Sequence, residues 1–244
     1  ANAFLAQRIS SINSIAALCE STGADIREVS RAIGTDNRIG SKFLDSGPGF
    51  GGSCFKKDIL NLVYLSKHFG LPEVAAFWES VVEMNSWHQH RISKLIVQKL
   101  FGTITGKKIA ILGFAFKANT NDTRESAAIQ ICKDLLEEGA NLIIHDPIVN
   151  ENQIKIDLKT SYNDQKTNFQ SSNSWSFTNT LDNVFKETHA VVILTEWSEY
   201  SNIDWVNTAK MMKKPGWVFD SRLIVNTKKV LEANLKLWRI GDGT

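Results

Sequence analysis

Apolar residues recur mostly at steps of three and four positions along the N-terminal part of the chain, a spacing typical of amphipathic helices. This pattern predicts a first helix over residues 2–21, ended by Gly23, and a second helix from just after Asp25 to about residue 34. A third helix is expected to begin with Ser53 as its capping residue and to end near Gly70. The N-terminal part is therefore predicted to be all-helical.

From Pro72 to about residue 101 the chain contains no helix breaker, and one helix about 45 Å long is predicted at about 1.5 Å per residue. A helix of that length exceeds what a small domain can cover. We therefore expect it to bridge two domains or to pack against a second subunit, and we predict a homodimer built on this helix, with a higher homo-oligomer as a further possibility.

After Gly106 the pattern changes to short apolar runs separated by helical segments, which predicts alternating strands and helices in an α/β, doubly wound parallel sheet. The predicted strands are KKIAILGF, NLIIHDP, AVVILTEW, GWVFDSR and LKLWRIG. The polar tract from about residue 150 to residue 180 is poorly periodic and is interpreted as a loop or a weakly ordered insertion. Two domains follow from these patterns: a helical region over residues 1–105 and a Rossmann-like domain over residues 106–244.

The composition, 43% hydrophobic and 22% charged, is that of an ordinary globular protein and excludes extended disorder as the main state. No basic run or long apolar stretch occurs, so neither a nucleic-acid partner nor a membrane is expected. Three widely spaced cysteines suggest no disulfide framework and no metal site, and a reducing, cytoplasmic location is the simpler expectation. Because the chain starts directly in a predicted helix, we expect it to be a fragment of a longer protein.

The stretch GFGGSCFKKD, residues 49–58, contains the first candidate chemistry. Cys54 is placed at the start of a predicted helix and next to two lysines, an arrangement that favours the thiolate required of a nucleophile. The surrounding glycines allow the backbone to approach a bulky ligand, and Asp58 would lie one helical turn away, where it could act on a water. A glycine-rich turn with an incidental cysteine fits the same spacing, and the spacing alone does not separate the two interpretations.

The loop after the first predicted strand, GFAFKANTNDTRES, has one glycine and lacks the GxGxxG cradle of a dinucleotide-binding domain. It contains Lys117 and Arg124 instead, two cations suited to a phosphate or a carboxylate. Arg222 lies at another strand end, at the edge of the sheet where such folds bind ligands. A solvated, charged loop is the alternative interpretation for all three residues.

Three stretches, NAFLAQRISSINSIAALCE, GFGGSCFKKD and GFAFKANTNDTRES, occur in the order typical of the UDP-glucose/GDP-mannose dehydrogenase family and closely resemble it. The resemblance covers essentially the whole chain and corresponds to the family's central helical region and C-terminal UDP-binding domain. The family's N-terminal NAD-binding domain is expected to be absent. The resemblance implies a four-electron oxidation of UDP-glucose to UDP-glucuronate with two NAD, through a thiohemiacetal and a thioester on a cysteine.

The resemblance also implies roles for individual residues. Cys54 would be the nucleophile, Asp58 would handle the catalytic water, and Asn2 would help to hold the developing oxyanion. The residues implied to bind the UDP-sugar are Arg38, Asp45, Ser46, Gly47, Pro48, Gly49, Phe50, Gly51, Phe116, Lys117 and Arg222, with Arg38 reaching a neighbouring subunit's site. The residues implied to face NAD are Cys54, Phe55, Lys56, Lys57 and Arg124.

The chain departs from the family pattern in three ways. The family's catalytic lysine lies just upstream of the asparagine of NAF, where this chain begins, and the glutamate that assists thioester hydrolysis belongs to the domain expected to be absent. Because the chain cannot bind NAD fully, it is expected to be inactive on its own. The segment FDSR has a serine where the family usually has a glycine before Arg222.

Two alternative functions remain: a related dehydrogenase acting on GDP-mannose or a UDP-N-acetylhexosamine, or a non-catalytic nucleotide-binding dimerisation module. The NAF helix and FKANTNDTRES favour UDP-glucose among the sugars.

Overall fold

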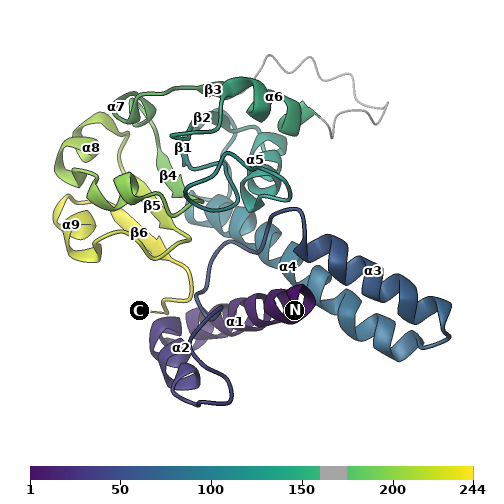
Figure 1. Cartoon of the computed structure of the whole chain (residues 1–244). Coiled ribbons are helices and arrows are strands. Elements are labelled where there is room, and N and C mark those ends of the chain that lie inside the picture. Colours follow the sequence, from purple (N-terminus) through teal and green to yellow (C-terminus); the bar gives the residue numbers. More distant parts are fainter. Residues whose placement is uncertain (160–174, 244) are drawn as a thin grey trace.

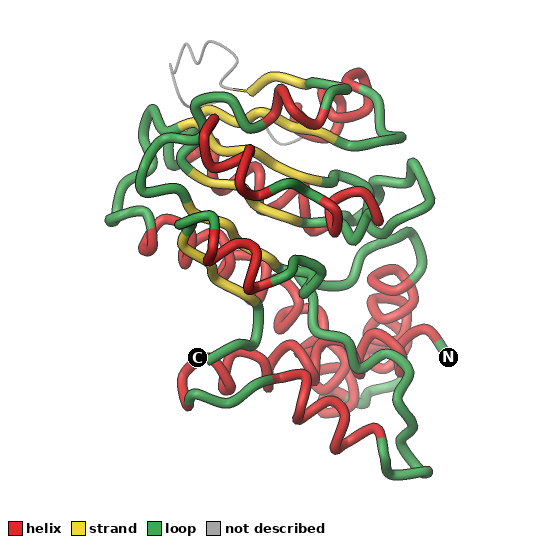
Figure 2. The backbone as a smooth tube through the Cα atoms, turned by 90° about the vertical axis from the view of Figure 1, so that its left-hand side faces the viewer, coloured by secondary structure: helices red, strands yellow, loops and turns green. Residues whose placement is uncertain are grey.

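The computed structural model describes residues 1–159 and 175–243, which form a helical region and a sheet with covering helices (Figures 1 and 2). The helical region contains four helices: α1 (Asn2–Thr22), α2 (Ile26–Gly34), α3 (Phe55–His68) and α4 (Pro72–Lys99). Gly23 ends α1 in the left-handed conformation, with φ 78°, and its N–H donates to the carbonyl of Cys19. All four helices are confirmed, but the predicted Ser53 cap is wrong: Cys54 is the residue before α3, and its side chain makes no capping bond.

The sheet has six parallel strands in the order β3-β2-β1-β4-β5-β6, which confirms the α/β, doubly wound class. The strands are β1 (Lys108–Leu112), β2 (Asn141–His145), β3 (Trp175–Phe177), β4 (Ala190–Ile193), β5 (Trp217–Asp220) and β6 (Lys236–Arg239). Strand order reverses between β1 and β4, whose last paired residues are Leu112 and Ile193, and Ile193 pairs in turn with Asp220. The carboxyl ends of β1, β4 and β5 therefore meet at one edge, where such sheets bind ligands.

The connections to the strands contain the helices α5 (Ala127–Glu137), α6 (Glu151–Lys159), α7 (Leu181–Val184), α8 (Trp205–Met211) and α9 (Thr227–Glu232) and the 3-10 helix η1 (Ser198–Asn202). The interpretation of the tract from residue 150 to residue 180 is corrected at both ends, because α6 buries Ile154 and Leu158 one turn apart and β3 pairs with β2. The middle of that tract, residues 160–174, lies outside the described residues.

The long helix α4 packs against both parts of the molecule. Its N-terminal half pairs with α3 in a hairpin that extends away from the sheet (Figure 1), and Trp78 and Val81 belong to the smaller core there. Its C-terminal half contributes Ile92 and Ile96 to the main core around the sheet. The helix thus links the two cores. In the part of the chain that the structure describes, no helix combines the length and the apolar composition of a membrane span.

Candidate functional site

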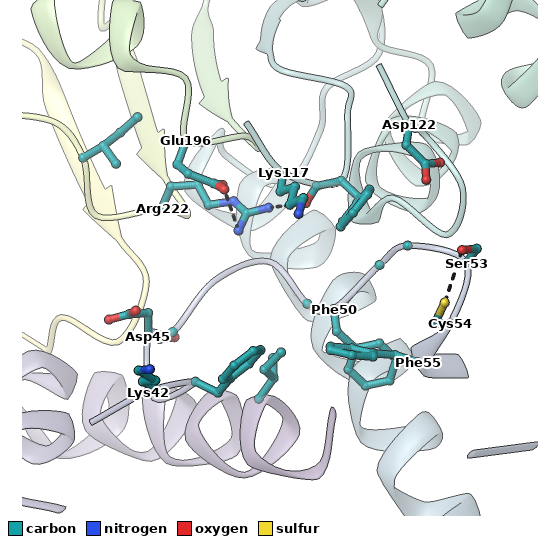
Figure 3. Close-up of a pocket in the computed structure, with 18 residues that line it drawn as sticks. Lys42, Asp45, Phe50, Ser53, Cys54, Phe55, Lys117, Asp122, Glu196 and Arg222 are labelled. Atoms are coloured by element: carbon teal, nitrogen blue, oxygen red, sulfur yellow. Dashed lines mark hydrogen bonds and ion pairs between the residues drawn. The ribbon is translucent and has the colours of Figure 1, made fainter. Parts of the chain in front are cut away.

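A cavity of about 880 Å³ lies between the helical region and the carboxyl ends of the strands (Figure 3). The glycine-containing segment that precedes α3 lines one side, and the loops after β1, β4 and β5 line the other. Of the predicted substrate-binding residues, Asp45, Ser46, residues 49–51, Phe116, Lys117 and Arg222 line it. Cys54 and Phe55 line it as well, so the structure brings the thiol and the predicted sugar-nucleotide residues to one cavity.

Cys54 presents an exposed, unpaired thiol at the N-terminus of α3. Its Sγ lies 3.5 Å from the hydroxyl Oγ of Ser53, and its carbonyl accepts the first helical bond, from the N–H of Asp58 at 2.8 Å. Two other cysteines, Cys19 and Cys132, are buried, and burial raises the pKa of each of these thiols. Exposure and helix position therefore distinguish Cys54 from the two core cysteines.

The glycines before Cys54 allow two backbone segments to touch. A Cβ atom on Gly51 would lie 2.5 Å from the carbonyl oxygen of Glu125 and 2.9 Å from Cβ of Phe116. Gly52 has φ of 84°, and its N–H donates to the carbonyl of Arg124 at 2.8 Å. Glycine is therefore required for the close packing of this segment, which leads directly to Cys54, against the β1–α5 loop.

Asn2 and Asp58 contact each other rather than the cavity wall. Nδ2 of Asn2 donates to Oδ2 of Asp58 at 2.7 Å, although 56 positions separate the two residues. Asp58 lies in the first turn of α3, four residues after Cys54. The three residues that the resemblance implies for catalysis thus lie together at one end of α3, and Asn2 fixes the direction of the Asp58 carboxylate.

Arg222 is the most constrained cation of the cavity. Its Nε donates to the carbonyl of Leu194 at 2.8 Å and its Nη2 donates to the carbonyl of Phe116 at 3.1 Å, while Nη1 lies 3.1 Å from Oε2 of Glu196. Burial lowers the pKa of Arg222, and the nearby Glu196 and Asp220 carboxylates oppose that effect. The guanidinium therefore ties the ends of β1, β4 and β5 together, with Nη1 near the position that a Cβ of Gly47 would occupy, at 3.3 Å.

The remaining cations differ in how they are paired. Arg124 forms a 2.7 Å ion pair with Asp122, whose carboxyl pKa is lowered by that hydrogen bond. Lys56 forms a 2.8 Å pair with Glu125. Lys117 lies over the ring of its neighbour Phe116, 5.4 Å from the centroid, and lines the cavity. Figure 3 shows Lys117, Glu196 and Arg222 across the cavity from Phe50 and Cys54.

Several predicted site residues do not line this cavity in the single chain. Arg38 pairs with Asp36 at 2.7 Å, and its side chain is 89% exposed. The others are Asn2, Gly47, Pro48, Lys56, Lys57, Asp58 and Arg124. Conversely, the cavity includes Lys42, Asp122 and Glu196, which sequence reasoning did not single out. Glu196 could have been found, because it belongs to the segment TEW at a predicted strand end.

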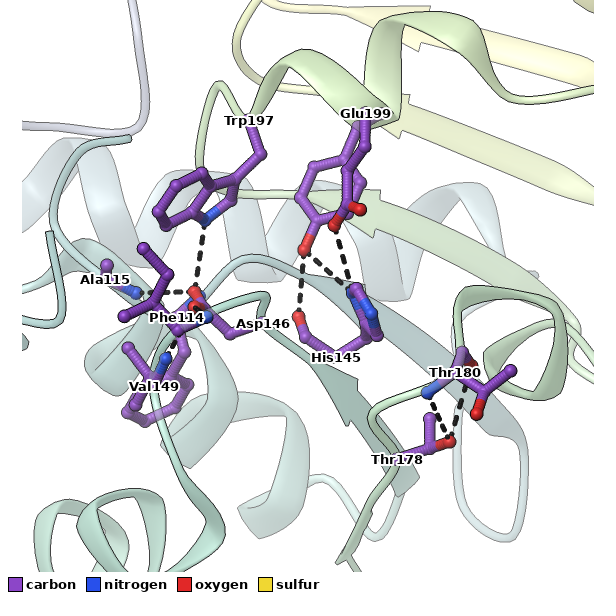
Figure 4. Close-up of polar contacts among 11 residues, drawn as sticks. Phe114, Ala115, His145, Asp146, Val149, Thr178, Thr180, Trp197 and Glu199 are labelled. Carbon is purple, nitrogen blue, oxygen red and sulfur yellow. Dashed lines mark hydrogen bonds and ion pairs between the residues drawn. The ribbon is translucent and has the colours of Figure 1, made fainter. Parts of the chain in front are cut away.

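A buried carboxylate that does not itself line the cavity connects two of the segments that do (Figure 4). Oδ2 of Asp146 accepts from the N–H groups of Phe114 at 2.7 Å and Ala115 at 3.1 Å, and from the indole Nε1 of Trp197 at 3.2 Å. The first two residues lead to Phe116, and the third follows Glu196. Asp146 thereby fixes the β1–α5 loop relative to the segment after β4.

Two models of one family match the chain. The central domain of the UDP-glucose/GDP-mannose dehydrogenase family matches residues 1–87, and the UDP binding domain of the same family matches residues 110–227. The two matched ranges contain the segment before α3 and the loops after β1, β4 and β5, respectively.

Among known proteins, a UDP-glucose 6-dehydrogenase of Drosophila melanogaster is 49% identical over 99% of this chain and 50% of its own length. A UDP-glucose 6-dehydrogenase of Gallus gallus is 52% identical over 93% of the chain and 45% of its own length. The structure of a UDP-glucose dehydrogenase from Pyrobaculum islandicum covers the whole chain with a TM-score of 0.79 and 29% identity, over 49% of that protein. The chain spans about half the length of the relatives it matches.

Proposed function

Because this chain belongs to the UDP-glucose/GDP-mannose dehydrogenase family, we propose that it contains the UDP-sugar site and the nucleophile of an NAD-dependent oxidoreductase that converts UDP-glucose to UDP-glucuronate. The observation that supports this most is the position of the exposed Cys54 thiol on the same cavity as Lys117 and Arg222. A structural cysteine would have no need of that position. The names of relatives at about half identity agree with UDP-glucose as the substrate.

Cys54 is the proposed nucleophile. Its Sγ would bond to the C6 carbon once that carbon is an aldehyde, and the carbonyl π electrons would move to oxygen and take up a proton. After the second two-electron oxidation the same sulfur would hold the carbon as a thioester. Water would then add to the acyl carbon, the C–S bond would break, and the carboxylate would leave as the thiol is regenerated.

Asn2 and Asp58 are proposed to serve these covalent steps. Asp58 would orient the attacking water and accept its proton, because a carboxylate one turn from Cys54 is placed to do so. An amide has two N–H groups, and one of those on Asn2 donates to Asp58. The other is proposed to stabilise the oxygen that becomes negative at C6.

The UDP-sugar is proposed to lie along the cavity between the segment before α3 and the sheet edge. Phe116 offers an aromatic face, Lys117 offers a cation for the diphosphate, and Arg222 holds the strand ends in place and presents Nη1. The backbone of residues 45–51, including Gly47 and Pro48, would enclose the sugar. Arg38, exposed and outside this cavity, is proposed to serve a neighbouring subunit's site.

NAD would supply the acceptor of the two hydrides. The described residues fit one edge of its site: Arg124 with its ion-pair partner Asp122, and the N-terminus of α3 from Cys54 to Lys57. The loop after β1 has no GxGxxG sequence, so this sheet is proposed for the UDP moiety rather than for NAD. A chain with these residues alone is proposed to bind the sugar nucleotide without turning it over. A reducing cytoplasm, where Cys54 stays a thiol, is the proposed location.

The proposed assembly is a homodimer through the α3–α4 hairpin. Phe69 and Phe77 are 71% and 51% exposed at this hairpin, which extends away from the sheet, and such apolar surface is typical of an interface. Sedimentation equilibrium is expected to give a dimer for the chain, and a Phe69→Glu, Phe77→Glu double variant is expected to sediment as a monomer. A monomeric wild-type chain at micromolar concentration would contradict this assembly.

Calorimetric titration tests the substrate. The chain is expected to bind UDP-glucose at least 10-fold more tightly than GDP-mannose, because relatives at about half identity are named UDP-glucose 6-dehydrogenases. In parallel, UDP-glucose is expected to slow the alkylation of Cys54 by iodoacetamide, since the thiol lies on the same cavity.

Two outcomes would contradict this proposal. Tighter binding of GDP-mannose or of a UDP-N-acetylhexosamine would assign the chain to another sugar nucleotide. Binding of UDP-glucose without protection of Cys54 would favour a non-catalytic nucleotide-binding module. A Cys132→Ser variant is the matched control for the alkylation experiment. Because the Cys132 thiol is fully buried, its removal should leave the alkylation rate unchanged.

A further inference from the structure

Three buried polar side chains form hydrogen bonds to the segment of residues 46–50, part of which lines the cavity where the sugar nucleotide is proposed to bind. Asn13 on α1 is 1% exposed, and Asn85 and His88 on α4 are 7% and 0% exposed. They all bond to residues 46–50, here called the sugar loop, of which Ser46, Gly49 and Phe50 line the cavity. Buried polar groups cost free energy unless they are satisfied, so a cluster of three that converges on one loop requires an explanation.

Asn85 holds both backbone groups of one loop residue. Its Oδ1 accepts from the N–H of Phe50 at 2.8 Å, and its Nδ2 donates to the carbonyl of Phe50 at 3.2 Å. Gly49, with φ of 129°, lies directly beside it, since a Cβ there would be 2.8 Å from Oδ1 of Asn85. One amide therefore takes the place of a neighbouring strand for this irregular stretch.

Asn13 and His88 together bond both backbone groups of Gly47. Oδ1 of Asn13 accepts from the N–H of Gly47 at 3.0 Å and from the hydroxyl of Ser46 at 3.1 Å. Nε2 of His88 lies 3.0 Å from the carbonyl of Gly47, and because that oxygen can only accept, Nε2 is the protonated nitrogen. Burial lowers the pKa of His88 to about 3, so the ring is neutral at pH 7. Its Nδ1 is buried without a hydrogen-bond partner.

We propose that Asn13, Asn85 and His88 are positioning residues that hold the sugar loop in its ligand-binding conformation before the sugar nucleotide arrives. A loop that is already ordered loses less conformational entropy on binding, which raises affinity without adding a contact. The loop continues directly through Gly51 and Gly52 to Cys54, so the same bonds also set the position of the thiol. This inference rests on the proposed function for its ligand, but the loop conformation can be measured without one.

The first test is an Asn85→Leu variant, which keeps the side-chain size and removes both bonds to Phe50. Amide hydrogen exchange measured by NMR is expected to be at least 100-fold faster at Phe50, while exchange at Ile111 in the central strand β1 stays within about threefold of wild type. The calorimetric affinity for UDP-glucose is expected to fall at least 10-fold. A Ser86→Ala variant, at the next position of α4, is the matched control and is expected to leave both quantities unchanged.

The second test separates positioning from general packing. His88→Leu removes the donor to Gly47, whereas His88→Gln replaces it with an amide N–H of similar reach. We expect the glutamine variant to recover UDP-glucose affinity to within about threefold of wild type, and the leucine variant to remain at least 10-fold weaker. Equal affinities of the two variants would overturn the proposal, because a packing role does not require a donor.

The remaining outcomes are distinguishable from a failure of the proposed function. Faster exchange at Phe50 with unchanged UDP-glucose affinity would overturn the positioning role. Unchanged amide exchange at Phe50 in the Asn85→Leu variant would overturn the proposal that these side chains order the sugar loop. If the wild-type chain binds no UDP-glucose, the proposed function fails for this chain, and exchange at Phe50 in Asn85→Leu still decides whether the three residues order the loop.

Discussion

Replacing Glu20 by alanine is expected to destabilise the chain by about 3 kcal/mol or more, the largest effect on stability that we predict from a single substitution. Glu20 is on α1, and its carboxylate accepts from both Nη atoms of Arg91 on α4, at 2.8 and 3.0 Å. It also accepts from the indole of Trp238 at 3.3 Å and from the N–H of Gly241 at 2.8 Å. Its side chain is 11% exposed, and that of Arg91 is 16% exposed.

The size of this effect follows from what the substitution leaves behind. Removing the carboxylate leaves the Arg91 guanidinium in a mostly buried position without its counter-charge, and it leaves two N–H donors without an acceptor. The substitution also weakens the contact between the residues after β6 and the helical region. Gly241 donates to Glu20 on α1, and its carbonyl accepts from the N–H of Ile26 on α2 at 2.8 Å. Both regions should therefore lose stability together.

Urea unfolding followed by circular dichroism measures this prediction. The matched control is Glu79→Ala, which breaks an ion pair with Lys67 of 3.1 Å in which the two side chains are 42% and 57% exposed. Exposed pairs contribute about 0–1 kcal/mol, so the control should change the free energy of unfolding by less than about 1 kcal/mol. Equal decreases in the free energy of unfolding for the two variants would show that Glu20 and its partners contribute no more to stability than a surface ion pair.

Most of the fold could be predicted from the sequence, because its signals are local. Gly23 and Pro72 mark a helix end and a helix start, and apolar runs such as KIAIL predict buried parallel strands. The errors also have local causes. Strand β3 has three residues and pairs on one side, and α6 has the apolar residues Ile154, Ile156 and Leu158 at alternating positions, which hides its helical face.

The candidate site was predictable in its parts but not in its connections. The strand end of Arg222 and the helix start of Cys54 are visible in the sequence, and the structure brings both to one cavity. That Arg222 bonds to Leu194 and Phe116 depends on the strand order, which places β1 and β5 on either side of β4. No local pattern separates a buried Asn85 from any other asparagine of a helix.

Substituting Arg222 is expected to produce the largest effect on ligand binding. Its guanidinium donates to two backbone carbonyls and forms an ion pair with the Glu196 carboxylate. Lysine keeps the charge but has a single nitrogen and no planar fork, so it cannot hold all three partners at once. We expect Arg222→Lys to weaken UDP-glucose binding about 10-fold, and Arg222→Ala about 100-fold, equivalent to about 2.7 kcal/mol.

The same calorimetric titration measures both variants, and circular dichroism establishes that each is folded. Arg31→Lys is the matched control, because it makes the same chemical change at an exposed position of α2. If Arg222→Lys bound UDP-glucose as tightly as wild type, the cavity would need only a positive charge at the end of β5. Loss of affinity in both variants, with Arg31→Lys unaffected, would mean that the three-way connection of the strand ends shapes the cavity that the ligand occupies.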